Sequence, residues 1–246
     1  MEHTTLTALA GDRGLSLDIG NADKLIRYGT MIHASNSLFN LTGMKSPEDI
    51  ITTLLLESIT PLCDINVPRG TSVADIGTGS GIPGIPLAIM FSGLYFTLFD
   101  SNGKKCRFIN EAAQSLGLGN VTVVEGRAEE LLQKPEYRER FGLSVSRALA
   151  HPYAAAELCI PAVRPGGLIY IYSHLTTLDL PVEITGHIQE LGASPVPFDS
   201  YFSYGINPGG ILMKKTTATP SRFPRRFAAI KRDAGKIIVE ASPAEV

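Results

Sequence analysis

Short apolar strands alternate with helical stretches from about residue 70 onward, and this alternation limits the fold more than any other feature of the chain. Strands joined by crossover helices lie parallel, so the alternation predicts a doubly wound sheet. Two later strands follow each other across residues 204–210 without a helix and should form an antiparallel hairpin. The sequence thus predicts an α/β fold with a mostly parallel, seven-stranded sheet. The expected strands cover residues 72–76, 95–100, 121–125, 143–146, 168–172, 194–202 and 211–214, with helices at 103–116 and 153–163.

The chain before residue 67 is predicted to be helical and to pack on this sheet. Apolar side chains recur at helical intervals over residues 23–39. Ser46-Pro47-Glu48-Asp49 combines a capping residue, an early proline and two acids, so a helix should begin there and continue to about Pro61. Residues 1–20 show no sustained period and are expected to be irregular. We divide the chain into a helical extension (1–66), a core (67–216) and a basic C-terminal segment (217–246).

Composition excludes several classes of protein. A chain of 246 residues has the length of one large α/β domain. Its longest apolar run, around residues 82–91, is broken by prolines and is too short for a membrane span. Charged residues near the start argue against a secretory signal, and the five histidines lie at no metal-binding spacing. We therefore expect a cytoplasmic protein without a membrane span or a metal. Three cysteines have neither disulfide nor zinc spacing: Cys63, Cys106 and Cys159.

Positive charge is concentrated near the C-terminus. The formal net charge is only −2, but residues 214–236 hold eight basic side chains and one acid, which leaves the rest of the chain acidic. A basic segment on an acidic body can contact phosphates or another anionic surface. The alternative is a solvated basic tail without a partner, and charge alone does not separate the two.

Glycines follow the first predicted strand in the run Val73-Ala74-Asp75-Ile76-Gly77-Thr78-Gly79-Ser80-Gly81-Ile82-Pro83-Gly84. The motif Gly79-x-Gly81-x-x-Gly84, with Asp100 ending the next strand, matches the fingerprint of a dinucleotide site. However, Pro83 and Pro86 remove two N–H donors that a pyrophosphate would need. Asp75 would repel a pyrophosphate but suits the cationic sulfonium of S-adenosylmethionine. The loop therefore favours a methyl donor over a dinucleotide, with a turn that binds no ligand as the third interpretation.

The motifs resemble those of a known family when they are taken together. GTGSGIPGIPLAI, FTLFDSNGKKCRFI, EGRAEEL and VSRALA occur in that order, as in the bacterial guanine-N7 methyltransferases of small-subunit (16S) ribosomal RNA, the glucose-inhibited division protein B family. Motifs ahead of the loop and the RFPRR run near the end are also similar, so the resemblance covers roughly residues 22–230. It implies a class I S-adenosylmethionine-dependent, Rossmann-like methyltransferase core.

The resemblance also assigns site residues. It implies that Gly77 and Ile82 line the S-adenosylmethionine site, with Gly79 and Gly81 shaping the loop. Asp100 resembles the acid that takes the ribose hydroxyls. By the same resemblance, Ala128 and Glu129 flank the adenine, and Arg147 positions cofactor and substrate. The alternative for Arg147 is a salt bridge to a neighbouring acid.

The chain departs from the family pattern at several positions. Ser80 stands where the family usually has proline, which should change the stiffness of the loop. Leu54 and Glu57 replace the His and Asp of a motif similar to HILDS, and Ser173-His174 replaces a common Lys-Gly pair. The last three changes bear on the substrate side of the site more than on the methyl donor.

Transfer to guanine N7 needs no general base, because this nitrogen carries a lone pair and no proton. No nucleophile–base constellation stands out in the sequence, and we expect positioning to supply the catalysis. Glu125 or Glu129 could stabilise the positive charge of the methylated purine. His151 and Tyr153 could line the base pocket, or could be ordinary core and surface residues.

RNA contacts are expected mainly at phosphates, with ribosomal RNA or the small subunit as the partner of a monomeric enzyme. Tyr201, Phe202 and Tyr204 could stack on a base or pack on an edge strand. Other interpretations stay open: a methyltransferase for another RNA, a protein or a small molecule, a nicotinamide oxidoreductase, or a non-catalytic RNA-binding protein. The candidate phosphate contacts are Lys104, Lys105, Arg107, Arg127, Arg222, Arg225 and Arg226.

Overall fold

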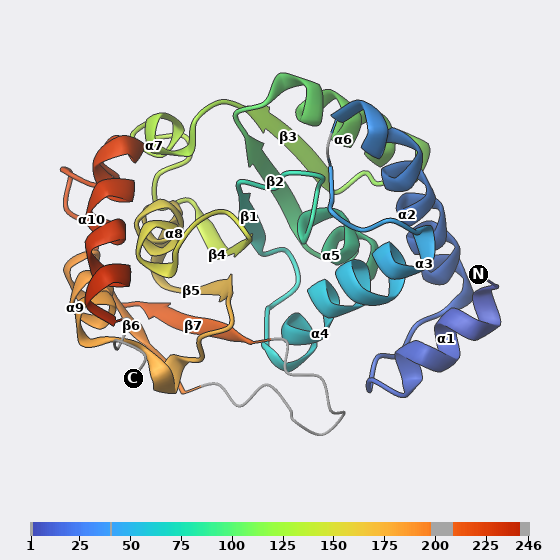
Figure 1. Ribbon diagram of the computed structural model, residues 1–246, viewed down its shortest axis with the longest axis horizontal. Coiled ribbons are helices and arrows are strands. Elements are labelled where there is room, and N and C mark those ends of the chain that lie inside the picture. Colours follow the sequence, from blue (N-terminus) through green and yellow to red (C-terminus); the bar gives the residue numbers. More distant parts are fainter. Residues whose placement is uncertain (1, 40, 198–208, 242–246) are drawn as a thin grey trace.

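A computed structural model describes residues 2–39, 41–197 and 209–241 of the chain (Figure 1). Within these residues, strands form one seven-stranded sheet in the order β3-β2-β1-β4-β5-β7-β6. Neighbouring strands from β3 to β5 pair in parallel, and β7 pairs antiparallel with both β5 and β6. The predicted doubly wound sheet and its antiparallel end are confirmed. The strands are β1 (Ser72–Ile76), β2 (Tyr95–Asp100), β3 (Val121–Glu125), β4 (Phe141–Arg147), β5 (Val163–Tyr172), β6 (Ala193–Pro195) and β7 (Gly210–Lys215).

Both faces of the sheet are buried by helices, because alternate strand residues point to opposite faces. Val73 and Leu98 belong to a cluster with the N-terminal helices, α5 and α6, whereas Ala74 and Phe99 belong to a second cluster with α8, α9 and α10. Figure 1 shows these two helical layers on either side of the strands. Helices along the core are α5 (Gly84–Met90), α6 (Gly103–Ser115), α7 (Ala128–Leu131), α8 (Pro152–Cys159), η2 (Ile160–Ala162), η3 (Thr177–Asp179) and α9 (Val182–Glu190).

The N-terminal part is helical from the start, which corrects one expectation. Residues 1–20 were expected to be irregular, but α1 (His3–Gly11) forms and packs on α2 (Ile19–Phe39). Leu6 and Ala10, one helical turn apart, are its fully buried anchors, and two apolar residues are too few to produce a visible period. The predicted helix after Ser46 is α3 (Pro47–Asp49), a π-helical turn η1 (Ile50–Leu55) and α4 (Leu56–Asp64) in succession.

The basic C-terminal segment contains a helix that sequence analysis did not assign, α10 (Phe227–Ala241). Ile230 and Ala234, four residues apart, are buried against the layer that contains α8. The strand expected at 194–202 is shorter, since β6 ends at Pro195. Residues 198–202 of that prediction, and Tyr204, lie outside the described residues. None of the described helices is long and apolar enough to cross a membrane.

Candidate active site

The glycine loop between β1 and α5 lies at the carboxyl end of the central strands. Gly79 and Gly81 have φ values of +61° and +79°, a left-handed conformation that favours glycine. The loop is tied to β2 at two points. Gly77 N–H donates to the Phe99 carbonyl at 2.9 Å, and Gly79 N–H donates to Asp100 Oδ2 at 2.8 Å. The chain's two strongest sequence signals, the loop and Asp100, are therefore in direct contact.

Asp75 lies beneath this loop instead of facing a ligand, which corrects its expected contact with the cofactor. Its side chain is fully buried and is not among the cavity-lining residues. Asp75 Oδ2 accepts hydrogen bonds from Thr78 Oγ1 at 2.5 Å and from the Gly84 N–H at 2.8 Å. Burial raises the pKa of this carboxyl to about 7, despite the opposing effect of the two hydrogen bonds. Asp75 thus shapes the loop from the protein side.

The N-terminal helices support the same loop from its other side. The Tyr28 hydroxyl, on α2, donates a hydrogen bond to the Ser80 carbonyl, and the Tyr28 side chain is fully buried. A methyl group at Gly81 would collide with this hydroxyl. Gly81 is therefore required by packing against α2 as well as by its backbone conformation.

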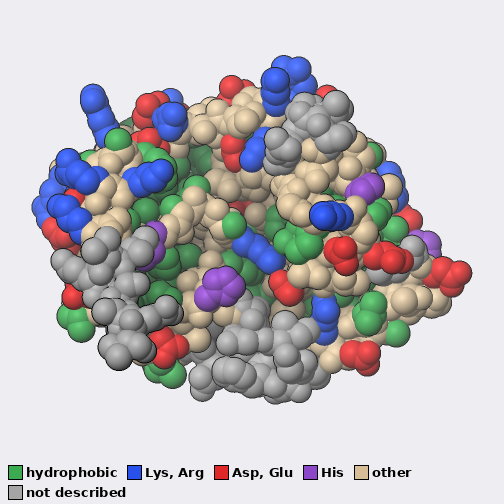
Figure 2. Space-filling view, viewed as in Figure 1, with side chains coloured by type: hydrophobic (Ala, Val, Ile, Leu, Met, Phe, Trp, Pro, Cys, Tyr) green, Lys and Arg blue, Asp and Glu red, His purple; other side chains and the backbone are tan. Residues whose placement is uncertain are grey.

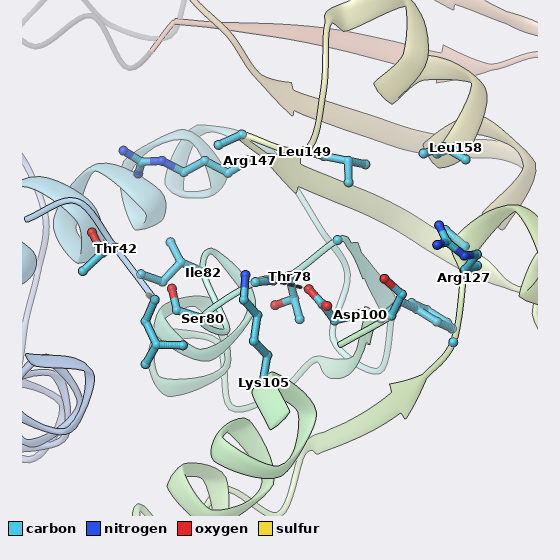
Figure 3. Close-up of a pocket in the computed structure, with 18 of the residues that line it drawn as sticks. Thr42, Thr78, Ser80, Ile82, Asp100, Lys105, Arg127, Arg147, Leu149 and Leu158 are labelled. Carbon is cyan, nitrogen blue, oxygen red and sulfur yellow. Dashed lines mark hydrogen bonds between the residues drawn. The ribbon is translucent and has the colours of Figure 1, made fainter. Parts of the chain in front are cut away.

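A cavity of about 510 Å³ opens above the loop (Figure 3). Its volume lies in the usual range for a small-molecule site. Loop residues form its floor, and the ends of β2 and β4 form its sides, as expected for the carboxyl edge of an open sheet. Residues after α2, Leu149, Leu158 and Phe227 also line it, although none of them was assigned to the site from the sequence. Seven of the eight expected cofactor residues meet here: Gly77, Gly79, Ile82, Asp100, Ala128, Glu129 and Arg147.

Arg147, at the end of β4, extends from this cavity toward the N-terminal helices (Figure 3). Its Nη2 lies 3.0 Å from Glu57 Oε2, and its Nη1 donates to Ser58 Oγ at 2.8 Å and to the Leu54 carbonyl at 3.0 Å. The salt bridge that sequence analysis held as the alternative is therefore present. Arg147 still lines the cavity, so its expected role in positioning cofactor and substrate stays a prediction beside the salt bridge.

A second cavity, of about 640 Å³, adjoins the first. The two share Leu54, Arg147 and Ala148 in their linings. Figure 2 shows this face of the molecule hollowed between the side of α10 and the N-terminal helices. Three of the departures from the family pattern, Leu54, Glu57 and Ser173-His174, lie in the wall of the second cavity. Among the described residues, its remaining lining consists of Ala150, Pro152, Tyr172 and Gly209.

Comparison with known proteins decides the family. The profile of the family described as GidB, rRNA small subunit methyltransferase G, matches residues 21–185. A ribosomal RNA small subunit methyltransferase G from Deinococcus deserti is 35% identical and aligns over 89% of this chain and 91% of its own. One from Acetivibrio thermocellus is 33% identical over 87% of this chain and 88% of its own. The chain belongs to the rRNA small subunit methyltransferase G family.

The solved structures agree on the fold. A SAM-dependent methyltransferase from Aquifex aeolicus aligns with a TM-score of 0.50 over 70% of this chain and 94% of its own, at 14% identity. The resemblance found in the motifs is therefore confirmed, and the methyl donor of the family and the fold is S-adenosylmethionine. Family membership also disfavours the nicotinamide oxidoreductase interpretation of the glycine loop.

The basic residues expected to contact RNA occupy different parts of this methyltransferase. Lys105 and Arg127 line the first cavity, and Arg127 lies 3.9 Å from Glu129. Arg107 lines a separate groove on the outer side of α6, and Lys104 is exposed on the same helix. Glu125 also lines that outer groove, so it is not placed to stabilise charge in either cavity.

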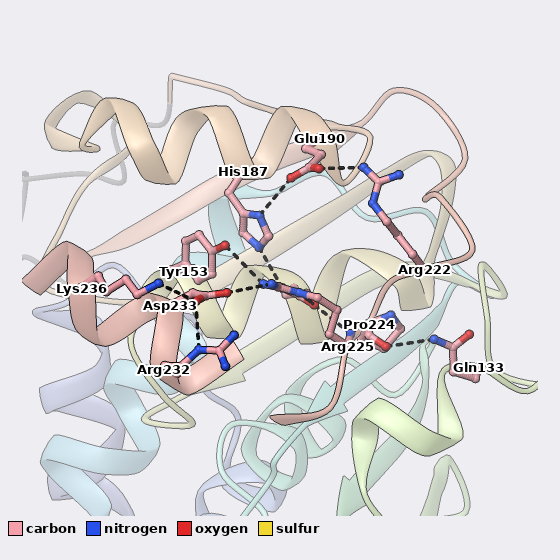
Figure 4. A network of polar contacts seen from close by, with 11 residues as sticks. Gln133, Tyr153, His187, Glu190, Arg222, Pro224, Arg225, Arg232, Asp233 and Lys236 are labelled. Atoms are coloured by element: carbon pink, nitrogen blue, oxygen red, sulfur yellow. Dashed lines mark hydrogen bonds and ion pairs between the residues drawn. The ribbon is translucent and has the colours of Figure 1, made fainter. Parts of the chain in front are cut away.

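Arg225 is a structural residue, which corrects its expected role in RNA binding (Figure 4). Its guanidinium lies 2.7 Å from Glu157 on α8 and 2.8 Å from Asp233 on α10. Glu157 is fully buried and also lies 3.1 Å from His187 Nε2. Burial would raise the pKa of Glu157, but the contact with His187 and the hydrogen bonds from Arg225 lower it to about 2. Arg225 therefore joins α8 to α10 instead of pointing to solvent.

The other candidate residues near this network differ in their exposure and in their partners. Arg222 is exposed and lies 2.7 Å from Glu190, whereas Arg226 is exposed with no ion pair among the described residues. Tyr153 stacks on the His187 ring at 3.8 Å, away from the second cavity, and the His151 ring accepts the Tyr153 N–H. Among the residues that the structure describes, no cluster of His, Cys, Asp or Glu could hold a metal ion.

Proposed function

We propose that this protein transfers a methyl group from S-adenosylmethionine to N7 of a guanine in small-subunit ribosomal RNA. One observation carries the proposal: in a chain of this family, the glycine loop, Asp100, Glu129 and Arg147 line one cavity at the carboxyl edge of the sheet. The motifs that resemble the guanine-N7 methyltransferases support the base and the atom. The names of the relatives support the small-subunit RNA.

The residues of the first cavity fit S-adenosylmethionine. Asp100 accepts one N–H on each oxygen, from Gly79 and from Asn102, and a carboxylate has about four acceptor positions, so two ribose hydroxyls can still be bound. Ala128 and Glu129 follow β3 and are placed to flank the adenine. Gly77 and Ile82 would contact the methionine end, where a glycine lets the backbone approach closely.

The cofactor supplies a methyl group on a positively charged sulfur, which makes that carbon electrophilic. Guanine N7 already carries the attacking lone pair, so the chain's own residues have to orient the two partners and exclude water. Alignment of this kind can lower a barrier by about 7–11 kcal/mol. Among the described residues that line the two cavities, no Ser or Cys is hydrogen-bonded to a His, which is consistent with this division of labour.

RNA binding is assigned to the exposed cations near the cavities. We propose that Lys104, Lys105, Arg107, Arg127, Arg222 and Arg226 contact phosphates, while Arg225 is excluded by its ion pairs. The same proposal makes the protein a cytoplasmic monomer whose substrate is ribosomal RNA or the small subunit. Its parts are the helical extension (1–66), the methyltransferase core (67–216) and the basic segment (217–246).

Mass mapping of ribosomal RNA from cells with and without this gene tests the substrate. We expect one guanosine of the small-subunit RNA to lose the mass of a methyl group in the deletion strain. Restoration by the wild-type gene and not by a cavity variant would complete the test. Unchanged small-subunit RNA, with S-adenosylmethionine binding intact, would instead favour another substrate.

Replacement of Asp100 tests the cofactor site. Asp100→Ala should weaken S-adenosylmethionine binding by about 1.5–3 kcal/mol, because the ribose loses a charged acceptor. Asp12→Ala, at an exposed carboxylate at the C-cap of α1, is the matched control. Calorimetry measures both, and equal dissociation constants for Asp100→Ala and the wild type would contradict the assignment.

A further inference from the structure

We infer that the second cavity holds the target guanine and that Glu57 recognises its Watson–Crick edge. The inference rests on the proposed function, because it names the substrate contact of that reaction. It concerns a residue that the sequence marked only as a departure from the family pattern.

The position of Glu57 beside both Arg147 and the second cavity supports this inference. Glu57 lies in the first turn of α4 and lines the second cavity, whereas Arg147 lines both cavities. A base in the second cavity would therefore meet the methyl donor across Arg147, with Glu57 on the far side from the cofactor. Both side chains are partly open, with 20% of Arg147 and 31% of Glu57 exposed.

Glu57 keeps an unused acceptor. Its Oε2 lies 3.0 Å from Arg147 Nη2, and no donor within the described part of the chain is hydrogen-bonded to Oε1. The ion pair fixes the carboxylate, so Arg147 acts on the base through Glu57 as a positioning residue. Tyr172 in the same wall is fixed as well, because its hydroxyl donates to the Ser58 carbonyl.

Guanine matches the Glu57 carboxylate better than the other bases do. Its Watson–Crick edge presents two adjacent donors, N1–H and the 2-amino group, and a carboxylate can accept both. Adenine presents an N1 lone pair at the same place, which a carboxylate repels. Enzymes that act on an extruded base commonly read this edge and stack the ring on apolar or aromatic walls. Pro152 and Tyr172 provide such walls here.

The charge of Glu57 also suits the reaction. The N7 lone pair forms the new bond to the methyl carbon, the carbon–sulfur electron pair stays on sulfur, and no proton leaves. The purine becomes positively charged, and its N1–H becomes a stronger donor to a carboxylate. A contact that strengthens as charge develops stabilises the transition state more than the bound substrate and raises kcat. Glu129 lines the first cavity and Glu125 an outer groove, so Glu57 is the acid placed for this role.

Nucleotide binding tests the recognition. Guanosine, inosine and adenosine 5′-monophosphates would be titrated into the wild type and into Glu57→Gln, with demethylated cofactor present. Inosine lacks the 2-amino group, so the wild type should bind it about 10-fold more weakly than guanosine. In Glu57→Gln this ratio should fall to near one, while Glu183→Gln, at an exposed site on α9, should keep it. An equal ratio in wild type and Glu57→Gln, or no guanosine binding by an active wild type, would overturn the inference.

Methylation kinetics test the charge. On small subunits from the deletion strain, Glu57→Gln should lower kcat by about 10- to 100-fold, and Glu57→Asp by less. The dissociation constant for S-adenosylmethionine should stay at the wild-type value, which also shows that the variant is folded. An unchanged kcat overturns the role of Glu57 and leaves the proposed function standing. Failure of the wild type to methylate the subunits would instead overturn the proposed function.

Discussion

Two arginine–glutamate pairs in this molecule have similar geometry and different surroundings. Arg147 and Glu57 approach to 3.0 Å between two cavities, and Arg225 and Glu157 approach to 2.7 Å between α8 and α10. Glu157 is completely buried and also contacts His187, whereas 31% of the Glu57 side chain is exposed and one of its oxygens has no hydrogen bond within the described residues. A carboxylate whose acceptors are filled by the protein holds the fold together. One with an open acceptor beside a cavity can bind a ligand.

The largest effect should follow loss of the buried pair. Arg225→Ala leaves the Glu157 carboxylate without its main partner in a buried position, which should lower the free energy of unfolding by about 3–5 kcal/mol. Urea denaturation measures it. Arg226→Ala, at the next residue and exposed, should change the same quantity by less than about 0.5 kcal/mol. Equal effects of the two substitutions would break the comparison.

The buried pair should also make the free energy of unfolding depend on pH in the acidic range. Because the pKa of Glu157 is lowered to about 2 from an ordinary value near 4.5, its pairing stabilises the fold above pH 4.5 and is lost as the pH falls toward 2. The loss should approach about 3 kcal/mol. Unfolding free energies of the wild type and Glu157→Gln, measured from pH 5 to pH 2, would differ in slope. Parallel curves would contradict the role of Glu157.

The cavity pair should matter little for stability. Arg147→Ala removes a partly exposed ion pair, and such pairs contribute about 0–1 kcal/mol. We expect its denaturation curve to lie near that of the wild type, while methylation of small subunits is lost. Destabilisation as large as that of Arg225→Ala would place Arg147 in the structural class instead.

The smallest expected effect is on the salt dependence of RNA binding, and it distinguishes Arg226 from the neighbouring Arg225. If the exposed Arg226 contacts a phosphate of single-stranded RNA, Arg226→Gln should lower the log–log salt slope of RNA affinity by about 0.7, or roughly 1.6-fold per doubling of salt. Arg164→Gln, at the exposed second residue of β5, is the matched control and should not change it. Affinities at four salt concentrations decide, and identical slopes would remove Arg226 from the interface.

The sheet and most of the first cavity could be predicted from sequence because their signals are local. Buried parallel strands appear as short apolar runs, and ligand residues follow at their carboxyl ends, as Asp100 and Arg147 do. The errors involve partners that only the folded structure places beside the residue. Arg225 resembles its basic neighbours until Glu157, 68 residues earlier, is placed beside it. By its place in the motif, Asp75 resembles a ligand for a cation. In the structure it accepts a hydrogen bond from the Gly84 N–H, which holds its side chain inside the protein.

Tyr28 lies in the part of the chain that is synthesised first, but the loop carbonyl it binds and the helices it packs against are made much later. Until α5 and α6 have left the ribosome, these helices cannot cover the apolar face of α2, which includes Leu25, Tyr28 and Ile32. The nascent protein therefore passes through a stage in which the apolar face of α2 is exposed. Slow translation between residues 40 and 115 would lengthen this stage, and it is there that chaperone binding should be sought.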